Sequence, residues 1–263
     1  MIIDTANKKT GIIFLVYGLF GFAVAITNMF LWRFYWEFGG NPISGLNYLS
    51  YFTYWGNLIT FAWLVLTGFA ILLKKEKLRR FLTSPAVFCG VVLYIVIVGL
   101  IFYGIIRWTI THIPWIFWYA RLVDFFFHAI TPLMMILLFV FVKKVPSAPS
   151  ADAFFSATTV IDNDSKSLGA KNDEKKLKQK HLLLYLILPM VYFIFSFIRG
   201  QIINWYPYPF IDPNWDVIAN LGISPWLYIP FMVVVFGGVF YLMGFVIMKI
   251  WNRLSKYENQ HNK

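Results

Sequence analysis

The chain has 263 residues, of which 59% are hydrophobic and 13% are charged, and its formal net charge is +11. Soluble globular proteins carry roughly 25% charged residues, and this chain has a mean hydropathy of +0.66. Its composition therefore excludes an ordinary soluble domain and indicates a membrane protein.

Six apolar segments are long enough to cross a bilayer. Helical blocks of about 18 or more uncharged residues span roughly 30 Å of hydrocarbon, and the sequence lacks the alternation typical of barrel strands. The expected fold class is therefore all-α: residues 1–263 form a single polytopic membrane domain, a six-transmembrane-helix bundle. The predicted helices cover residues 11–31, 51–73, 85–106, 123–142, 182–200 and 226–248.

The basic residues predict the orientation of this bundle, because Lys and Arg resist translocation. Most of the 23 basic residues lie before the first span, between spans 2 and 3, between spans 4 and 5, and after span 6. The remaining ones are Arg33, Arg107, Arg121 and Arg199. Both termini are therefore expected to be cytoplasmic in a multi-pass protein of the cell membrane. Membrane lipids are its expected partners, and nucleic acid is not.

Residues 145–180, between the fourth and fifth spans, are rich in Ser, Ala, Asp and Lys. This composition predicts a mostly disordered cytoplasmic linker within the single domain. Cys89 is the only cysteine and lies inside the third span. It permits neither an intrachain disulfide nor a thiolate metal site, and we expect no metal and no cofactor.

Tryptophans gather toward the predicted outer face of the membrane, and Trp55 is one of them. An aromatic belt at the interface explains several of them. Yet only Trp251 lies near the cytoplasmic boundary, and a belt predicts a more even distribution. The alternative is an aromatic-walled pocket for a partly apolar ligand.

Polar residues occur at a similar depth in two of the predicted helices. At about 1.5 Å per residue, His128 of "DFFFHAITP" lies at the level of Thr53 and Asn57 of "FTYWGNLIT". Asp124 precedes His128 by four residues, so the two share a helix face. Ionisable groups inside a span commonly cost about 2.5 to 3.5 kcal/mol at the centre and usually face a partner or a wet cavity. The pair therefore indicates either a functional site or a hydrogen-bonded helix contact.

Three motifs resemble a known family. "FTYWGN" opens the second span, "DFFFHAITP" opens the fourth, and "RGQIINWYPYPFID" closes the fifth. In this order they resemble the androgen-induced / androgen-dependent TFPI-regulating family of six-helix membrane proteins, and in particular its prokaryotic six-span branch. The resemblance covers the chain except the linker. It implies a six-helix bundle, and its animal members hydrolyse fatty acid esters of hydroxy fatty acids with a threonine nucleophile and a histidine.

Carried over by motif, those catalytic roles fall on Thr53 and His128. A neutral imidazole can remove the proton of a threonine hydroxyl near pH 7, and Asp124 would orient that imidazole. Asn57 and Arg199 are candidates for binding a substrate carboxylate or the oxyanion. The aromatic and acidic residues near the same face, namely Trp55, Tyr208 and Asp212, complete the predicted substrate contacts.

Three hypotheses for function follow from these residues. The first is a membrane-embedded hydrolase of a lipid-like ester near the outer leaflet. The second is a non-enzymatic protein that binds or transports a lipid or small solute, with Asp124 and His128 as a proton-linked site. The third is a structural or regulatory membrane protein. The separation of the Thr53 hydroxyl from the His128 ring distinguishes them, since catalysis requires about 3 Å or one bridging water.

Overall fold

The computed structural model describes residues 7–36, 45–107, 118–142, 176–215, 220 and 222–261. Within these ranges all regular structure is helical and there is no β-strand. The prediction of an all-α fold is confirmed to this extent: six helices are long and apolar enough to cross a membrane. They cover Lys8–Phe30, Phe52–Leu72, Pro85–Ile106, Arg121–Phe141, Gln179–Ile203 and Pro225–Lys256.

The spans are assembled from α-helices and shorter helical pieces. A 3-10 helix (Gly45–Ser50) precedes the second span and another (Pro209–Ile211) follows the fifth, while π-helical turns (Phe102–Ile106 and Phe126–Ile130) interrupt the third and fourth. The α-helices are α1 (Lys8–Trp36), α2 (Phe52–Leu72), α3 (Glu76–Leu82), α4 (Pro85–Ile101), α6 (Trp118–Phe125), α7 (Thr131–Phe141), α10 (Gln179–Tyr185), α11 (Ile187–Ile203) and α13 (Pro225–His261).

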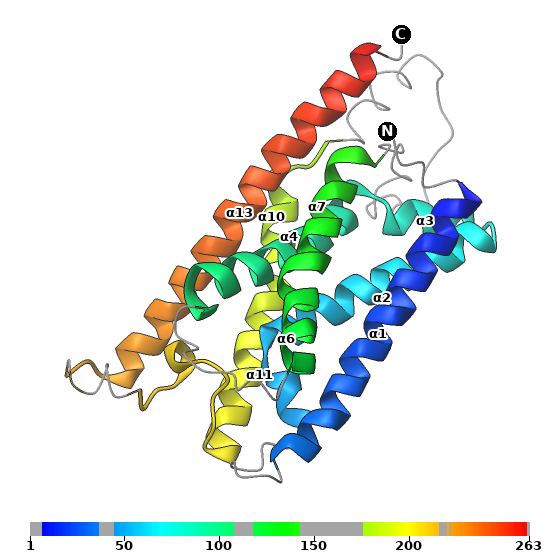
Figure 1. Cartoon of the computed structure of the whole chain (residues 1–263). Helices are drawn as coiled ribbons and strands as arrows, with labels where there is room; N and C mark the ends of the chain where they lie inside the picture. Colours follow the sequence, from blue (N-terminus) through cyan, green and yellow to red (C-terminus); the bar gives the residue numbers. More distant parts are fainter. Residues whose placement is uncertain are drawn as a thin grey trace, which may run out of the picture.

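Helix α4 lies at the centre of the bundle. It contacts α2, α7 and α13, while α1 packs along α2 on one flank (Figure 1). Small residues allow the close approach of α1 and α2: a Cβ added to Gly68 would lie 2.8 Å from the carbonyl oxygen of Gly11. Close backbone approach through small residues is a common way to pack helices in lipid, where there is no hydrophobic driving force between them.

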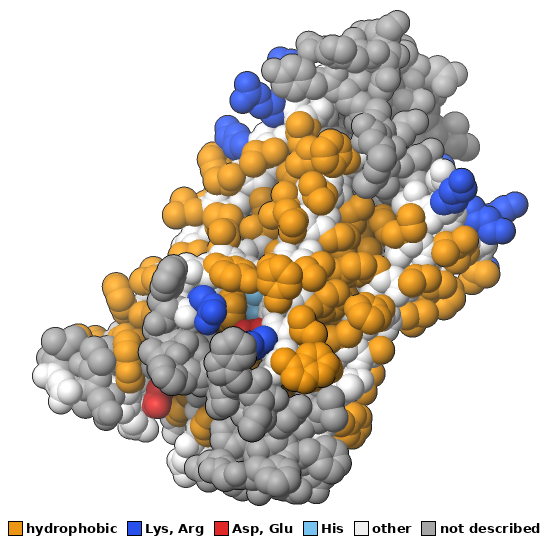
Figure 2. Space-filling view, viewed as in Figure 1, with side chains coloured by type: hydrophobic (Ala, Val, Ile, Leu, Met, Phe, Trp, Pro, Cys, Tyr) orange, Lys and Arg blue, Asp and Glu red, His pale blue; other side chains and the backbone are white. Residues whose placement is uncertain are grey.

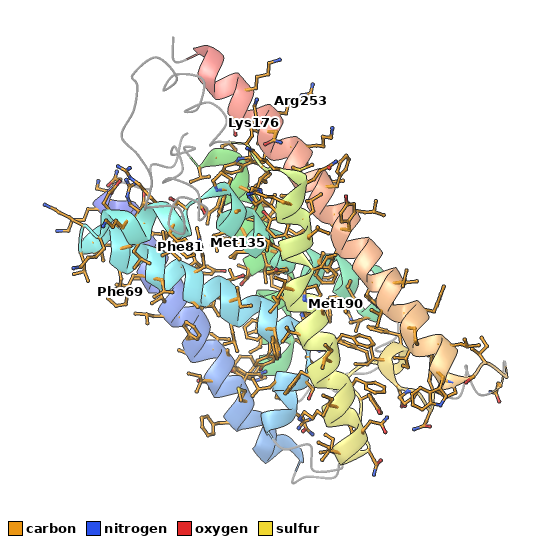
Figure 3. All side chains as sticks on the ribbon, turned by 180° about the vertical axis from the view of Figure 1, so that it is seen from behind. Phe69, Phe81, Met135, Lys176, Met190 and Arg253 are labelled. Carbon is orange, nitrogen blue, oxygen red and sulfur yellow. The ribbon has the colours of Figure 1, made fainter. Side chains whose placement is uncertain are left out.

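The outside of the bundle is apolar. Figure 2 shows hydrophobic side chains over the middle of the visible face, with most of its Lys and Arg toward the end where α13 finishes. Seen from behind, Phe69 and Met190 point outward (Figure 3), and both are exposed. Such a surface is unfavourable in water and suits contact with lipid chains.

The start of α1 and the end of α13 lie at the same end of the bundle, as an even number of spans requires (Figure 1). Lys176 and Arg253 lie at this end too (Figure 3). Leu177 is fixed to α13, because its N–H donates to Asn252 Oδ1 at 2.9 Å and Asn252 Nδ2 donates back to its carbonyl at 3.0 Å. The rest of the predicted linker, residues 145–175, lies outside the described residues.

The two π-helical turns meet through one buried pair of rings. The ring of Phe102, which begins one turn, stacks on His128 in the other with centroids 3.7 Å apart. A cause for the second turn is visible in the sequence: Pro132 has no N–H to donate to the His128 carbonyl four residues earlier. Such turns occur frequently at functional sites.

Candidate functional site

Thr53 lies in the first turn of α2, directly after the 3-10 helix Gly45–Ser50. Neighbouring helices hold the end of this 3-10 helix. The Tyr192 hydroxyl on α11 donates to the Ser50 carbonyl at 2.6 Å, and Arg199 donates to Ser50 Oγ at 2.7 Å. Arg199 also donates to Asn47. These bonds fix the entry into α2 and thereby the position of the Thr53 hydroxyl.

His128 meets Thr53 across the interface between the second and fourth spans. Thr53 Oγ1 and His128 Nε2 are 3.1 Å apart, which is within hydrogen-bond reach for proton transfer. On the other side of the ring, Nδ1 lies 2.9 Å from the backbone carbonyl of Asp124 and 3.3 Å from its Oδ1. The structure thus places His128 between Thr53 and Asp124. This is the arrangement in which a histidine, oriented by a third group, can act as base toward a threonine nucleophile.

These contacts determine where the ring carries its proton. Nδ1 of His128 faces two acceptors of Asp124, a carbonyl and a carboxylate oxygen. Two acceptors favour the tautomer with hydrogen on Nδ1, and Nε2 then has a lone pair directed at the Thr53 hydroxyl. The arrangement can therefore accept the threonine proton on Nε2 while Asp124 orients the ring and stabilises the resulting cation.

The imidazole is held rigidly. His128 is buried, and the stacked Phe102 ring covers one of its faces. Helix α4 approaches the same turn so closely that a Cβ on Gly99 would lie 2.9 Å from the His128 carbonyl oxygen. Packing on these sides leaves the ring little freedom to leave Thr53.

Asn57 lies one turn below Thr53 and is completely buried. Its amide nitrogen donates to the Thr53 carbonyl at 2.9 Å and to the Phe127 carbonyl at 3.3 Å. It therefore joins the second span to the residue directly before His128. Its Oδ1 has no hydrogen-bond partner among the described residues, and an acceptor cannot bind an oxyanion.

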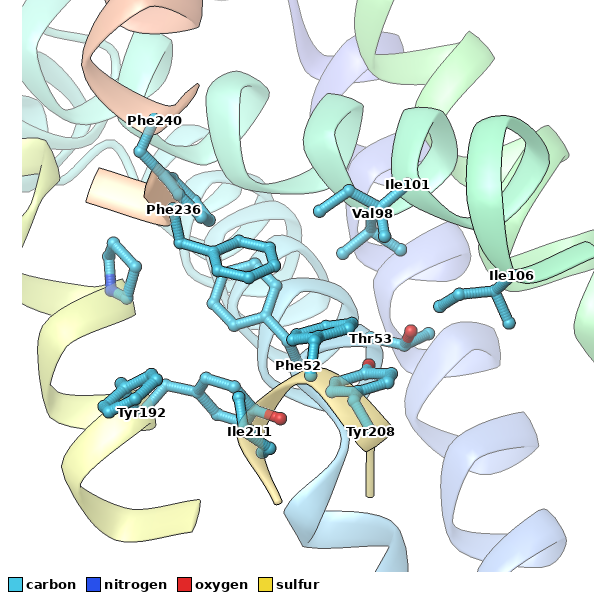
Figure 4. A pocket seen from close by; sticks show the side chains of 13 residues that line it. Phe52, Thr53, Val98, Ile101, Ile106, Tyr192, Tyr208, Ile211, Phe236 and Phe240 are labelled. Atoms are coloured by element: carbon cyan, nitrogen blue, oxygen red, sulfur yellow. The ribbon is translucent and has the colours of Figure 1, made fainter. Parts of the chain in front are cut away.

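An apolar pocket opens beside Thr53 between α2, α4, α11 and α13 (Figure 4). Its empty volume, counted out into the open space at the mouth, is about 550 Å³. His128 stays behind Thr53, outside the lining. The lining consists of Phe52, Thr53, Val98, Ile101, Ile106, Pro189, Tyr192, Phe193, Tyr208, Phe210, Ile211, Phe236 and Phe240.

Of the predicted substrate contacts, only Tyr208 lines the pocket with Thr53. Trp55 points to the preceding segment, where its Nε1 donates to the Leu49 carbonyl at 2.7 Å. Arg199 is bound to the 3-10 helix as described above, and Asp212 accepts from the backbone N–H of Asn214 at 2.8 Å. The structure therefore separates Trp55, Arg199 and Asp212 from the pocket wall, and gives the first two a role in holding the start of α2.

Sequence reasoning missed Phe102, which stacks on the imidazole, and Tyr192, which lines the pocket and holds Ser50. Nothing in their sequence context distinguishes them from the many other aromatic residues of the chain. Across the described part of the chain, no group of three or more His, Cys, Asp or Glu side chains could hold a metal ion.

Comparison with models of protein families, with curated proteins and with solved structures finds no match to this chain.

Proposed function

We propose that the protein is a membrane-embedded hydrolase of lipid-like esters that uses Thr53 as nucleophile and His128 as general base. The observation that carries the proposal is the 3.1 Å separation of Thr53 Oγ1 and His128 Nε2 at the wall of an apolar pocket. The motif resemblance to the androgen-induced / androgen-dependent TFPI-regulating family supports the same reaction class, and we infer that the chain belongs to its prokaryotic six-span branch.

The reaction divides into two steps. Thr53 Oγ attacks the ester carbonyl carbon while its proton passes to His128 Nε2. The protonated ring then gives that proton to the leaving alkoxide, and the product is an acyl-threonine and a free alcohol. In the second step, His128 takes a proton from water and the resulting hydroxide attacks the acyl carbon. The bond between that carbon and Thr53 Oγ then breaks, the ring returns its proton to Thr53 Oγ, and the fatty acid is released.

The pocket determines the substrate class that we propose. Its wall is aromatic and aliphatic apart from the Thr53, Tyr192 and Tyr208 hydroxyls, so an acyl chain fits better than a polar head group. The ester would lie at Thr53 in the first turn of α2. With the orientation expected from the basic residues, this turn lies near the outer leaflet, and both termini are cytoplasmic.

A fluorophosphonate activity probe on the detergent-purified protein tests the proposal. We expect covalent labelling of the wild type and its loss in Thr53→Ala and His128→Ala. Thr60→Ala is a matched control, because Thr60 is another buried threonine of α2 whose hydroxyl bonds the Gly56 carbonyl at 2.8 Å. Labelling that survives both site substitutions contradicts the proposal.

The Asp124 carboxylate favours a second candidate function. Its side chain is 34% exposed and that of His128 is 8% exposed, so the pair extends from the buried interior to the surface. A protein that binds or transports a lipid or small solute together with a proton could use such a pair. It predicts pH-dependent uptake into liposomes without ester turnover, and uptake that is unchanged in Asp124→Asn contradicts it.

A further inference from the structure

Tyr208 is held rigidly in the wall of the pocket. It lies in the segment between α11 and α13, and 9% of its surface is exposed. Its ring stacks on Phe210 at 4.9 Å and 7° and meets the edge of Tyr51 at 5.6 Å and 84°. Such aromatic pairs stabilise the ring position beyond the effect of burial alone. The direction of the hydroxyl is therefore fixed by packing.

The Tyr208 hydroxyl reaches the start of α2 beside the nucleophile (Figure 4). Burial raises the pKa of this phenol, and the nearby Tyr51 adds to the increase. The neighbouring Thr53 side chain and the backbone N–H groups of Phe52 and Thr53 act in the opposite direction. The group therefore stays protonated and polarised by the positive end of a long helix.

Among the described residues around the pocket, the hydrogen-bond donors other than Tyr208 already have a partner or a role. Three lining residues carry hydroxyl groups: Thr53, Tyr192 and Tyr208. Thr53 is the proposed nucleophile, and Tyr192 already donates to the Ser50 carbonyl. Asn57 and Arg199, the other candidate donors, are outside the lining and donate to protein groups. Among described residues, Tyr208 is the remaining side-chain donor that can face a carbonyl bound at Thr53.

We propose that Tyr208 is a further catalytic residue, whose hydroxyl donates a hydrogen bond to the carbonyl oxygen of the ester as that oxygen becomes negatively charged. This inference rests on the proposed hydrolase function. As the Thr53 Oγ–carbon bond forms, the carbonyl electron pair moves to oxygen and the Thr53 proton moves to His128. Tyr208 keeps its own proton throughout and stabilises the oxyanion by donation.

The test is turnover of p-nitrophenyl octanoate by the purified protein in detergent micelles. Tyr208→Phe keeps the ring and removes only the hydroxyl. Loss of one oxyanion donor lowers kcat by about 10² to 10³-fold, and we expect this loss with KM within about twofold of wild type. Tyr206→Phe is the matched control, because Tyr206 lies two residues away, bonds Gln201 and does not line the pocket; its kcat stays unchanged.

Binding of an inhibitor that forms an oxyanion adduct is a second test, for the case that small structural changes affect kcat. An alkyl trifluoromethyl ketone forms an oxyanion adduct with an activated hydroxyl, and it should bind Tyr208→Phe about 10²-fold more weakly but Tyr206→Phe normally. Turnover that requires Thr53 but is unchanged in Tyr208→Phe overturns the role of Tyr208 alone. Turnover that is unchanged in Thr53→Ala overturns the proposed function and this inference together.

Discussion

At the scale of single residues, the site depends on three side chains from two spans. Thr53 Oγ1 contacts the lone pair of His128 Nε2, and Asp124 supplies two acceptors for the opposite nitrogen. The carbonyl is the nearer acceptor, at 2.9 Å against 3.3 Å for the carboxylate oxygen. The backbone thus fixes the tautomer, and the carboxylate mainly stabilises the cation that forms during the reaction.

Because the carbonyl fixes the tautomer and the carboxylate mainly stabilises the cation, Asp124→Asn should lower activity only moderately. The carbonyl of residue 124 still holds the proton on Nδ1, while the ion pair between the carboxylate and the protonated ring, 3.3 Å apart, is lost. We expect kcat for ester turnover to fall by about 10- to 100-fold, less than in His128→Ala. Asp212→Asn, outside the pocket, serves as control. A loss as large as that of His128→Ala means that the carbonyl does not hold the tautomer.

Asn57 gives a second prediction at this scale, for stability. Asn57→Ala removes the donors to the Thr53 and Phe127 carbonyls, and buried groups left without partners cost about 1 to 3 kcal/mol each. We expect a lower Tm in detergent for this variant. Gln201→Ala removes one bond from an exposed side chain and should leave Tm within about 1 °C. An unchanged Tm in Asn57→Ala shows that these bonds are not stabilising.

At the scale of elements, α4 meets the fourth span along α7 and along the π-helical turn that carries His128. Gly99 on α4 touches the turn that carries His128, whereas Gly104, in the facing turn, has no atom within 4 Å of an added Cβ. The two glycines of one span thus provide a tight position and an open position for the same substitution.

Gly99→Ala should therefore displace His128, and Gly104→Ala should not. The new methyl group would lie 2.9 Å from the His128 carbonyl and 3.2 Å from the Pro132 ring, and backbone atoms yield only by moving the helices apart. Overpacking of this kind costs about 1 to 3 kcal/mol. We expect lower turnover and lower Tm for Gly99→Ala only. Equal behaviour of the two variants contradicts this picture of the helix contact.

At this scale, the sequence predicts the spans, but it does not predict the irregular turns or the partners of individual side chains. Uncharged blocks predict the six spans because lipid requires that pattern, and depth counting indicates that Thr53 and His128 lie at the same level. Counting cannot predict the π-helical turns, since it assumes a regular helix. It also cannot assign partners: Arg199 and Asp212 are predicted substrate contacts, yet they bond the 3-10 helix and Asn214. Side-chain direction at span ends depends on irregular loops.

At the scale of the whole molecule, the bundle has an apolar exterior and an end rich in basic residues. Lys176 and Arg253 lie at this end, on which α1 begins and α13 finishes (Figures 1 and 3). The segment that carries Tyr208 and Asn214 follows α11 at the opposite end. If the basic end is cytoplasmic, the pocket lies toward the outer side of the membrane.

Cysteine accessibility tests this orientation. Cys89 is fully buried, and Cys89→Ser provides a background without cysteine. In intact cells we expect a membrane-impermeant maleimide to label Asn214→Cys, and to label Lys77→Cys only after permeabilisation, because both native side chains are exposed at opposite ends of the bundle. The reverse pattern contradicts the orientation and moves the site to the inner leaflet.

The most direct test of the central claim is detection of the acyl-threonine itself. The purified protein is mixed with p-nitrophenyl octanoate, quenched in acid and analysed by intact mass and peptide mapping. The account predicts one added octanoyl group on the Thr53 hydroxyl in the wild type, and no adduct in His128→Ala. An octanoyl group on another residue, or turnover without any adduct on Thr53, contradicts it.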